Sequence, residues 1–136
     1  MLRGGCHCGA LTVAFTTAYA PEALPLRACQ CGFCRRHGAR YTTDRQGHLQ
    51  LVADADALVR YRFGLGTADF LLCGRCGIYV ACVVDDAFAC LNSRALDDAA
   101  RLTQPATPVD YAAETAEIRL TRRHATWTPA TIELRR

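Results

Sequence analysis

The spacing of the cysteines constrains this chain more than any other feature. Seven of its nine cysteines fall into three tight groups along 136 residues. The groups lie in the segments GGCHCG, CQCGFC and CGRCG, and their members are Cys6 and Cys8, then Cys29, Cys31 and Cys34, then Cys73 and Cys76. A chain of this length can bury one sizeable core, so we expect one domain over residues 1–136. The first and last groups can share an ion only if that core brings distant segments together.

The start of the chain favours metal ligation over disulfides. In the stretch MLRGGCHCGALTVAF the apolar run comes late and is broken by Thr12, which predicts neither a signal peptide nor a membrane span. We therefore expect a cytoplasmic protein, in which thiols stay reduced. Grouped cysteines in that compartment indicate metal binding or catalysis.

The charges argue against polyanionic partners. The formal net charge is only +3, and the 16 basic residues are all arginines scattered along the chain. A nucleic-acid site usually requires a concentrated basic face. We therefore expect neither nucleic acid nor a membrane as a partner, whereas exposed short strands are compatible with a homodimer.

Hydrophobic periodicity predicts a chain that is mostly β up to Asn92. Residues 10–16 alternate strictly, with Leu11, Val13 and Phe15 on one side, as in a half-buried strand. Similar alternation or short apolar runs between turn residues predict further strands at 48–52, 58–63, 70–72, 78–84 and 88–91. The predicted fold class is therefore all-β.

Two short helical segments are expected near the C-terminus. Ser93 is a candidate N-cap for one or two helical turns. A second helix is predicted over residues 113–123, because Glu114 lies early in it and Arg122 and Arg123 lie late, as the helix dipole favours.

The two outer cysteine groups supply two ligands each. In CGRCG the glycines let the backbone curl so that both sulfurs face one ion. In GGCHCG the sulfurs converge only where the backbone bends, a freedom that the flanking glycines supply. A structural zinc takes four protein ligands. Two ligands from each outer group would complete such a site, formed by Cys6, Cys8, Cys73 and Cys76.

The middle group is then left with three sulfurs. A catalytic zinc keeps three protein ligands and an open position, which is the role predicted for Cys29, Cys31 and Cys34. An alternative remains, since a histidine could complete the triplet as a second structural site; the candidates are His7, His37, His48 and His124. Cys82 and Cys90 stand alone on predicted buried strands and are predicted to be small apolar core residues.

These motifs resemble those of the GFA family, which is named for glutathione-dependent formaldehyde-activating enzyme and includes centromere protein V. The resemblance rests on GGCHCGAL, CQCGFCRRHGA and FLLCGRCG in that order. It extends to LVRYRF, CLNSRALDD and EIRLTRRHATW, and so covers most of the chain. It implies a β-tent, in which small antiparallel sheets are pinned by zinc.

The resemblance also implies an activity and two zinc ions per chain. Cys6, Cys8, Cys73 and Cys76 would hold a structural zinc, and Cys29, Cys31 and Cys34 a catalytic one that binds the glutathione thiol. Because it has only three protein ligands, we expect the catalytic zinc to be the more easily lost. The implied reaction is that of a carbon–sulfur lyase, which joins glutathione and formaldehyde into S-(hydroxymethyl)glutathione. The competing function is a non-catalytic zinc module for protein or chromatin interaction.

Three further residues are candidates for substrate binding. Arg35 and Arg36 follow the triplet, so we expect them to balance its negative charge or hold a glutathione carboxylate. Their alternative role is that of solvated arginines on a short helix. Asn92 matches a polar position of the family's late motif and is expected to reach the pocket, a turn or cap role being the alternative.

Overall fold

A computed structural model describes the whole chain, residues 1–136, and confirms the all-β fold class. The strands are β1 (Leu2–Gly5), β2 (Leu11–Thr16), β3 (Arg27–Cys29), β4 (Tyr41–Thr42), β5 (His48–Asp54), β6 (Leu58–Tyr61), β7 (Asp69–Cys73), β8 (Tyr79–Val84), β9 (Phe88–Asn92), β10 (Thr107–Val109) and β11 (Thr128–Arg135). The helices are α1 (Gly32–His37) and α2 (Ala116–Thr126), with short 3-10 turns at Pro21–Ala23, Ser93–Ala95 and Ala99–Arg101.

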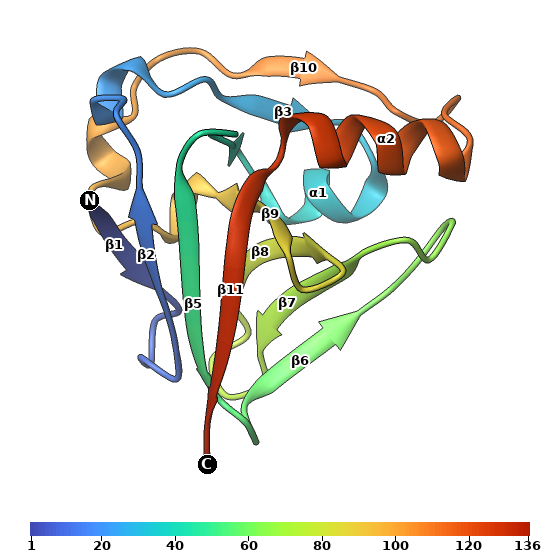
Figure 1. Ribbon diagram of the computed structural model, residues 1–136. Coiled ribbons are helices and arrows are strands. Elements are labelled where there is room, and N and C mark those ends of the chain that lie inside the picture. Colours follow the sequence, from blue (N-terminus) through green and yellow to red (C-terminus); the bar gives the residue numbers. More distant parts are fainter.

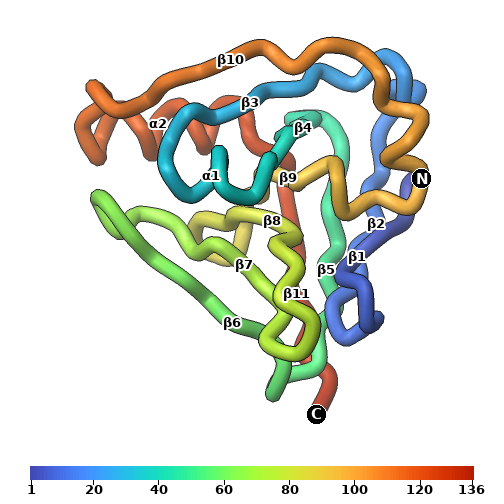
Figure 2. The backbone as a smooth tube through the Cα atoms, turned by 180° about the vertical axis from the view of Figure 1, so that it is seen from behind, coloured from blue at the N-terminus to red at the C-terminus, as the bar shows by residue number.

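The strands form two walls that meet at one end and diverge at the other. In Figure 1 the wall with β1, β2, β5 and β11 meets the wall with β6, β7 and β8 near the bottom, and β3, β10 and α2 lie across the top. Figure 2 shows the same arrangement from behind, with α1 beneath β3. β11 joins the walls, because its first residues pair with β9 and the rest pair with β5. All strand pairs are antiparallel except β11 with β5 and β10 with β3.

The apolar residues fill two adjoining cores. In β2 the side chains of Leu11, Val13 and Phe15 are buried, as their alternation predicts. They belong to a cluster of 20 buried residues between the walls. A second cluster of 10 buried residues contains Cys34, Tyr79 and other side chains around the middle cysteine group. The fold thus places that group beside an aromatic core at the open end of the walls.

The C-terminal part differs most from the sequence-based expectation. Residues 10–16, 48–52, 58–63, 70–72, 78–84 and 88–91 all contribute strands, but the sequence predicts neither β10 and β11 nor the short strands β1, β3 and β4. α2 begins three residues later than expected because Thr115 is its N-cap, and its side chain accepts a hydrogen bond from the Ile118 amide (3.2 Å). Glu114 therefore lies outside the helix. The 3-10 turn at Ser93–Ala95 is capped by Asn92, not by Ser93.

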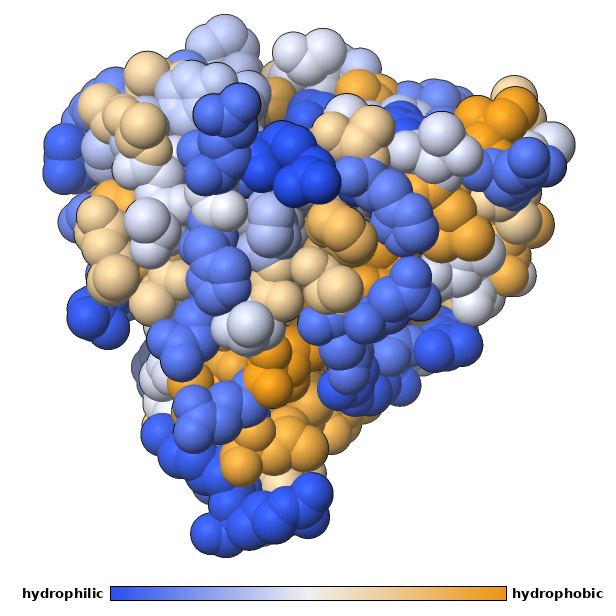
Figure 3. Space-filling view, viewed as in Figure 1, coloured by the Kyte–Doolittle hydropathy of each residue, from blue (hydrophilic) through white to orange (hydrophobic).

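The surface is largely hydrophilic on the face shown in Figure 3, with an apolar strip over the lower parts of β11 and β6. Exposed apolar residues of these strands include Leu134 and Val59. None of the helices combines the length and the apolar composition needed to cross a lipid bilayer.

A close backbone contact explains why position 4, shortly before the first cysteine, is a glycine. Gly4 of β1 pairs with Leu96, and a Cβ atom at Gly4 would lie 2.2 Å from the Ala95 carbonyl oxygen. Only glycine lets β1 approach the 3-10 turn so closely.

We predict that Gly4→Ala lowers the free energy of unfolding by about 1–3 kcal/mol, because the methyl group forces two backbone segments apart. Gly66→Ala is the control, since Gly66 has a φ of 66° and nothing within 4 Å of a Cβ atom, so it reports left-handed strain alone. Urea unfolding of both variants measures the difference. Equal destabilisation would contradict the contact argument.

Candidate metal centres and the adjoining pocket

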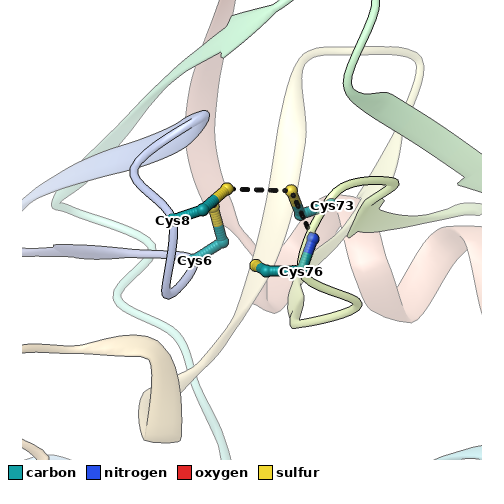
Figure 4. Close-up of side chains that lie close together, drawn as sticks. All are labelled: Cys6, Cys8, Cys73 and Cys76. Carbon is teal, nitrogen blue, oxygen red and sulfur yellow. Dashed lines mark hydrogen bonds between the residues drawn. The ribbon is translucent and has the colours of Figure 1, made fainter.

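Four cysteines from opposite walls converge at the closed end of the fold. The turn between β1 and β2 carries Cys6 and Cys8, and the end of β7 and the following turn carry Cys73 and Cys76 (Figure 4). All four sulfurs lie within 4.8 Å of one another. The Sγ atoms of Cys6 and Cys8 are 3.7 Å apart, and those of Cys8 and Cys73 are 3.5 Å apart. Tetrahedral zinc with Zn–S bonds of about 2.3 Å places its sulfurs about 3.8 Å apart, so the spacing fits zinc.

The two turns also supply amide donors to these sulfurs. The Leu11 amide donates to Cys6 Sγ (3.2 Å), and the Arg75 amide donates to Cys73 Sγ (3.3 Å). Gly77, with a φ of 81°, reverses the chain after Cys76. Such hydrogen bonds stabilise sulfur in its ionised, ligating form. Arg75 further ties this turn to the neighbouring wall by ion pairs with Asp54 (3.0 Å) and Asp56 (2.8 Å).

The middle cysteines form a second, separate cluster. Cys29 ends β3, Cys31 is the N-cap of α1, and Cys34 lies within α1. Their sulfurs lie within 4.8 Å of one another, and no histidine nitrogen or carboxylate oxygen joins the set at that distance. Cys31 Sγ accepts a hydrogen bond from the Cys34 amide (3.3 Å). This cluster therefore offers three thiol ligands and no fourth protein ligand.

A buried pair of tyrosines supports the triplet from the core side. The Tyr41 hydroxyl lies 3.0 Å from Cys34 Sγ and 2.7 Å from the Tyr79 hydroxyl. An ionised Cys34 could only accept, so Tyr41 would donate to it and Tyr79 would donate to Tyr41. Burial raises the pKa of both tyrosines, which keeps these protons on the hydroxyls. The sequence alone predicts a site role for neither tyrosine.

Hydrogen bonding within the triplet shifts the pKa values of Cys29 and Cys34 in opposite directions. A hydrogen bond from Cys34 lowers the pKa of Cys29 to about 6, and the positive charge of Arg122 also lowers it. The same hydrogen bond raises the pKa of Cys34. Cys29 thus loses its proton more readily than Cys34.

A pocket of about 270 Å³ opens beside the triplet. All three cysteines of the triplet line it, together with Phe63 and Tyr111 and three arginines of α2, which are Arg119, Arg122 and Arg123. Asp110 is the one acidic residue in the lining, so the lining carries a net positive charge. These arginines follow the spacing i, i+3 and i+4, which places them on one face of a helix.

Arg119 and Arg122 are held in place by the segment before α2. Arg122 donates two hydrogen bonds of 2.9 Å to the Glu114 carboxylate and stacks over the Tyr111 ring. Arg119 donates to the Tyr111 carbonyl oxygen (2.7 Å) and lies 3.5 Å from Glu114. The Arg122 and Arg119 ion pairs lower the pKa of Glu114, so that it stays ionised.

The residues expected to bind substrate lie elsewhere. Arg35 and Arg36 are exposed on α1 and do not line this pocket. Asn92 is buried, accepts from the amides of Arg94 (3.3 Å) and Arg40 (3.4 Å), and donates to the Tyr79 carbonyl oxygen (3.0 Å). It thus has the contacts of a cap, while α2 supplies the guanidinium groups of the pocket.

The two isolated cysteines belong to the core. Cys82 and Cys90 face each other across β8 and β9 and are buried. Burial raises the pKa of Cys90 to about 11 and that of Cys82 well above its usual value. Both therefore remain neutral thiols at physiological pH, as expected of small apolar core residues.

Comparisons with known proteins agree with the cysteine motifs. The chain is similar to a Rhodobacter sphaeroides protein of known crystal structure, with 32% sequence identity, a TM-score of 0.58, and coverage of 79% of this chain and 98% of that chain. A family model described as glutathione-dependent formaldehyde-activating enzyme (GFA) matches residues 1–113, which include every cysteine. The chain therefore belongs to the GFA family.

Proposed function

We propose that the protein is a zinc-dependent carbon–sulfur lyase that adds a thiol to a small aldehyde. With glutathione and formaldehyde the product would be S-(hydroxymethyl)glutathione. One observation carries the proposal: a cluster of three cysteines, without a fourth protein ligand, lies in the wall of a positively charged pocket. The family assignment supports the choice of substrates.

The donor sets support one zinc ion at each cluster. Both consist of thiols alone, which suit zinc better than the harder magnesium or calcium ions. The four-cysteine set would be closed and structural, and the triplet, Cys29, Cys31 and Cys34, would be catalytic. A zinc ion at the triplet would supply a coordination position for a visiting thiol and lower that thiol's pKa below its ordinary value of about 8.5.

The pocket would bind the rest of the thiol compound. Glutathione carries two carboxylates, and the guanidinium groups of Arg119 and Arg122 are suited to such groups. Glu114 holds both arginines toward the pocket while leaving the lining positively charged. The prediction that Arg35 and Arg36 hold a carboxylate has less support, because neither lines the pocket.

The chain would hold the two substrates in position, and the reaction would form a single covalent bond, between sulfur and carbon. The ionised sulfur of the visiting thiol forms a bond to the carbonyl carbon of the aldehyde. The carbonyl oxygen receives the electron pair of the broken π bond and takes up one proton, which replaces the proton that the thiol lost. The reverse reaction releases the aldehyde.

The alternative function, a zinc module for protein or chromatin interaction, has less support. Such a module needs closed zinc sites, and it gives no reason for an incomplete ligand set beside a pocket. The GFA family model, named for an enzyme, also favours catalysis.

We predict that Cys31→Ser and Cys76→Ser have different effects. Cys76→Ser opens the structural site, and because structural zinc binding is folding free energy, we expect a loss of about 3 kcal/mol or more and a fall in Tm of about 10 °C. Cys31→Ser should keep the fold and lose the acceleration of glutathione–formaldehyde exchange. Calorimetry and NMR exchange rates, compared with the uncatalysed reaction, measure these effects. If both variants unfold alike, the two roles are wrongly assigned.

We predict that Arg122→Gln weakens the binding of glutathione in particular. A charge-assisted hydrogen bond contributes about 1.5–3 kcal/mol, so the KM for glutathione should rise about 10- to 100-fold. The KM for 2-mercaptoethanol, which has no carboxylate, should change less than about threefold. Kinetics with both thiols on wild type and variant make the comparison. Equal losses for the two thiols would contradict carboxylate recognition by Arg122.

A further inference from the structure

A second, smaller cavity, called the inner chamber, adjoins the larger pocket at Cys29 and Cys34. Its volume is about 60 Å³, and its lining is mostly apolar, with Tyr41, Phe70 and Trp127 among the residues. Cys29 and Cys34 line this inner chamber as well as the larger pocket. Six residues in all line both spaces, so a group bound in the inner chamber would lie next to a molecule in the larger pocket.

Arg123 lines both spaces and is a buried charge without a counter-charge. Its side chain and backbone together are 8% exposed, and no carboxylate lies within 4.0 Å of its guanidinium group. One terminal nitrogen donates to the Thr67 hydroxyl (2.9 Å), whereas the buried Nε has no hydrogen-bond partner. Burial lowers the pKa of Arg123, but a guanidinium group stays charged at neutral pH. The guanidinium group also lies 4.9 Å from the centroid of the Trp127 ring, a cation–π contact that leaves the Nε donor unsatisfied. A buried charge with an unsatisfied donor and no carboxylate partner is costly to the fold and is suited to binding an anion.

The other arginines nearby do not share this state. Arg119 and Arg122 both face the Glu114 carboxylate. Arg27, which also lines the inner chamber, is half-buried and donates to the Thr43 hydroxyl (2.9 Å). Arg123 alone among the four combines burial, an unused donor and the absence of a carboxylate partner.

We propose that the inner chamber is the aldehyde subsite and that Arg123 is a catalytic residue that binds the aldehyde oxygen as it becomes negative. This inference rests on the proposed function of the triplet. As the sulfur–carbon bond forms, the π electrons of the carbonyl group move to oxygen, which gains a negative charge. The Arg123 guanidinium donates a hydrogen bond to that oxygen, which then takes one proton from water. In sum, one thiol and one aldehyde give one hemithioacetal.

The size of the chamber restricts the aldehyde. One water molecule needs about 10–15 Å³ on this scale, so 60 Å³ admits only a few non-hydrogen atoms. Formaldehyde fits this space, and we expect branched or aromatic aldehydes to fit it less well. Val109 of β10 is a half-buried part of the lining, and its truncation would enlarge the chamber.

The first test is the kinetics of Arg123→Gln. We expect kcat for the glutathione–formaldehyde reaction to fall about 100- to 1000-fold, the usual effect of removing a donor to an oxyanion. The KM for glutathione and the zinc content should be unchanged. Arg101→Gln, in which an exposed arginine is replaced, is the matched control. A kcat within threefold of the wild type, or a rise in the KM for glutathione as in Arg122→Gln, would overturn the role of Arg123.

The second test does not depend on catalysis or on that variant alone. Formate mimics the small oxyanion, and its Kd for the zinc-loaded protein, measured by NMR titration, should rise at least tenfold in Arg123→Gln and in Arg123→Met but not in Arg101→Gln. If Arg123→Gln and Arg123→Met do not fold, Val109→Ala should still raise the rate with isobutyraldehyde relative to formaldehyde. The proposed aldehyde subsite is wrong if the Kd for formate does not depend on Arg123, or if Val109→Ala leaves the aldehyde preference unchanged. A third outcome separates the two proposals. If the wild type accelerates the reaction of no aldehyde but formate binding still depends on Arg123, the proposed function is wrong and the anion site is supported.

Discussion

The convergence of two turns from opposite walls is the constraint on which the rest of the structure depends. The β1–β2 turn and the β7–β8 turn bring four sulfurs to the spacing that one tetrahedral zinc requires. A metal held there links segments more than 60 residues apart. With the closed end fixed in this way, the two walls diverge toward the end where β3, α1 and α2 surround the second cluster (Figure 1).

Charge balance connects that second cluster to its pocket. Under the proposed function, three thiolates with one divalent zinc would leave one net negative charge, which would need positive groups nearby. α2 supplies them, but unequally: Glu114 neutralises part of the charge of Arg119 and Arg122, whereas Arg123 is buried without an acid. In the proposed reaction, the buried guanidinium would thus serve both the resting cluster and the negative charge that develops on the aldehyde oxygen. This arrangement explains why the pocket has several arginines and only one acidic lining residue.

The sequence predicts the cluster chemistry better than the pocket. Ligand counting groups the sulfurs in the sets that the structure brings together, because thiolate number is a local property of each motif. Alternation likewise locates β2, whose inward side chains are fully buried. β11 escapes prediction because most of its residues remain partly or fully exposed, so that its apolar pattern is weak. Arg35 and Arg36 follow Cys34 directly, yet both are exposed on α1 and neither lines the pocket. The spacing of Arg119, Arg122 and Arg123 on one helical face was the signal for the pocket, but only the tertiary fold shows what that face meets.

The central claim is that the protein has two sulfur sites, one closed and one with a position for an external thiol. Cadmium-113 NMR of the metal-substituted protein tests it most directly, because the resonance of each ion depends on its own ligands. The account predicts two resonances of equal intensity, of which one shifts when glutathione is added and the other does not. A single resonance, or two that are both insensitive to glutathione, would contradict it.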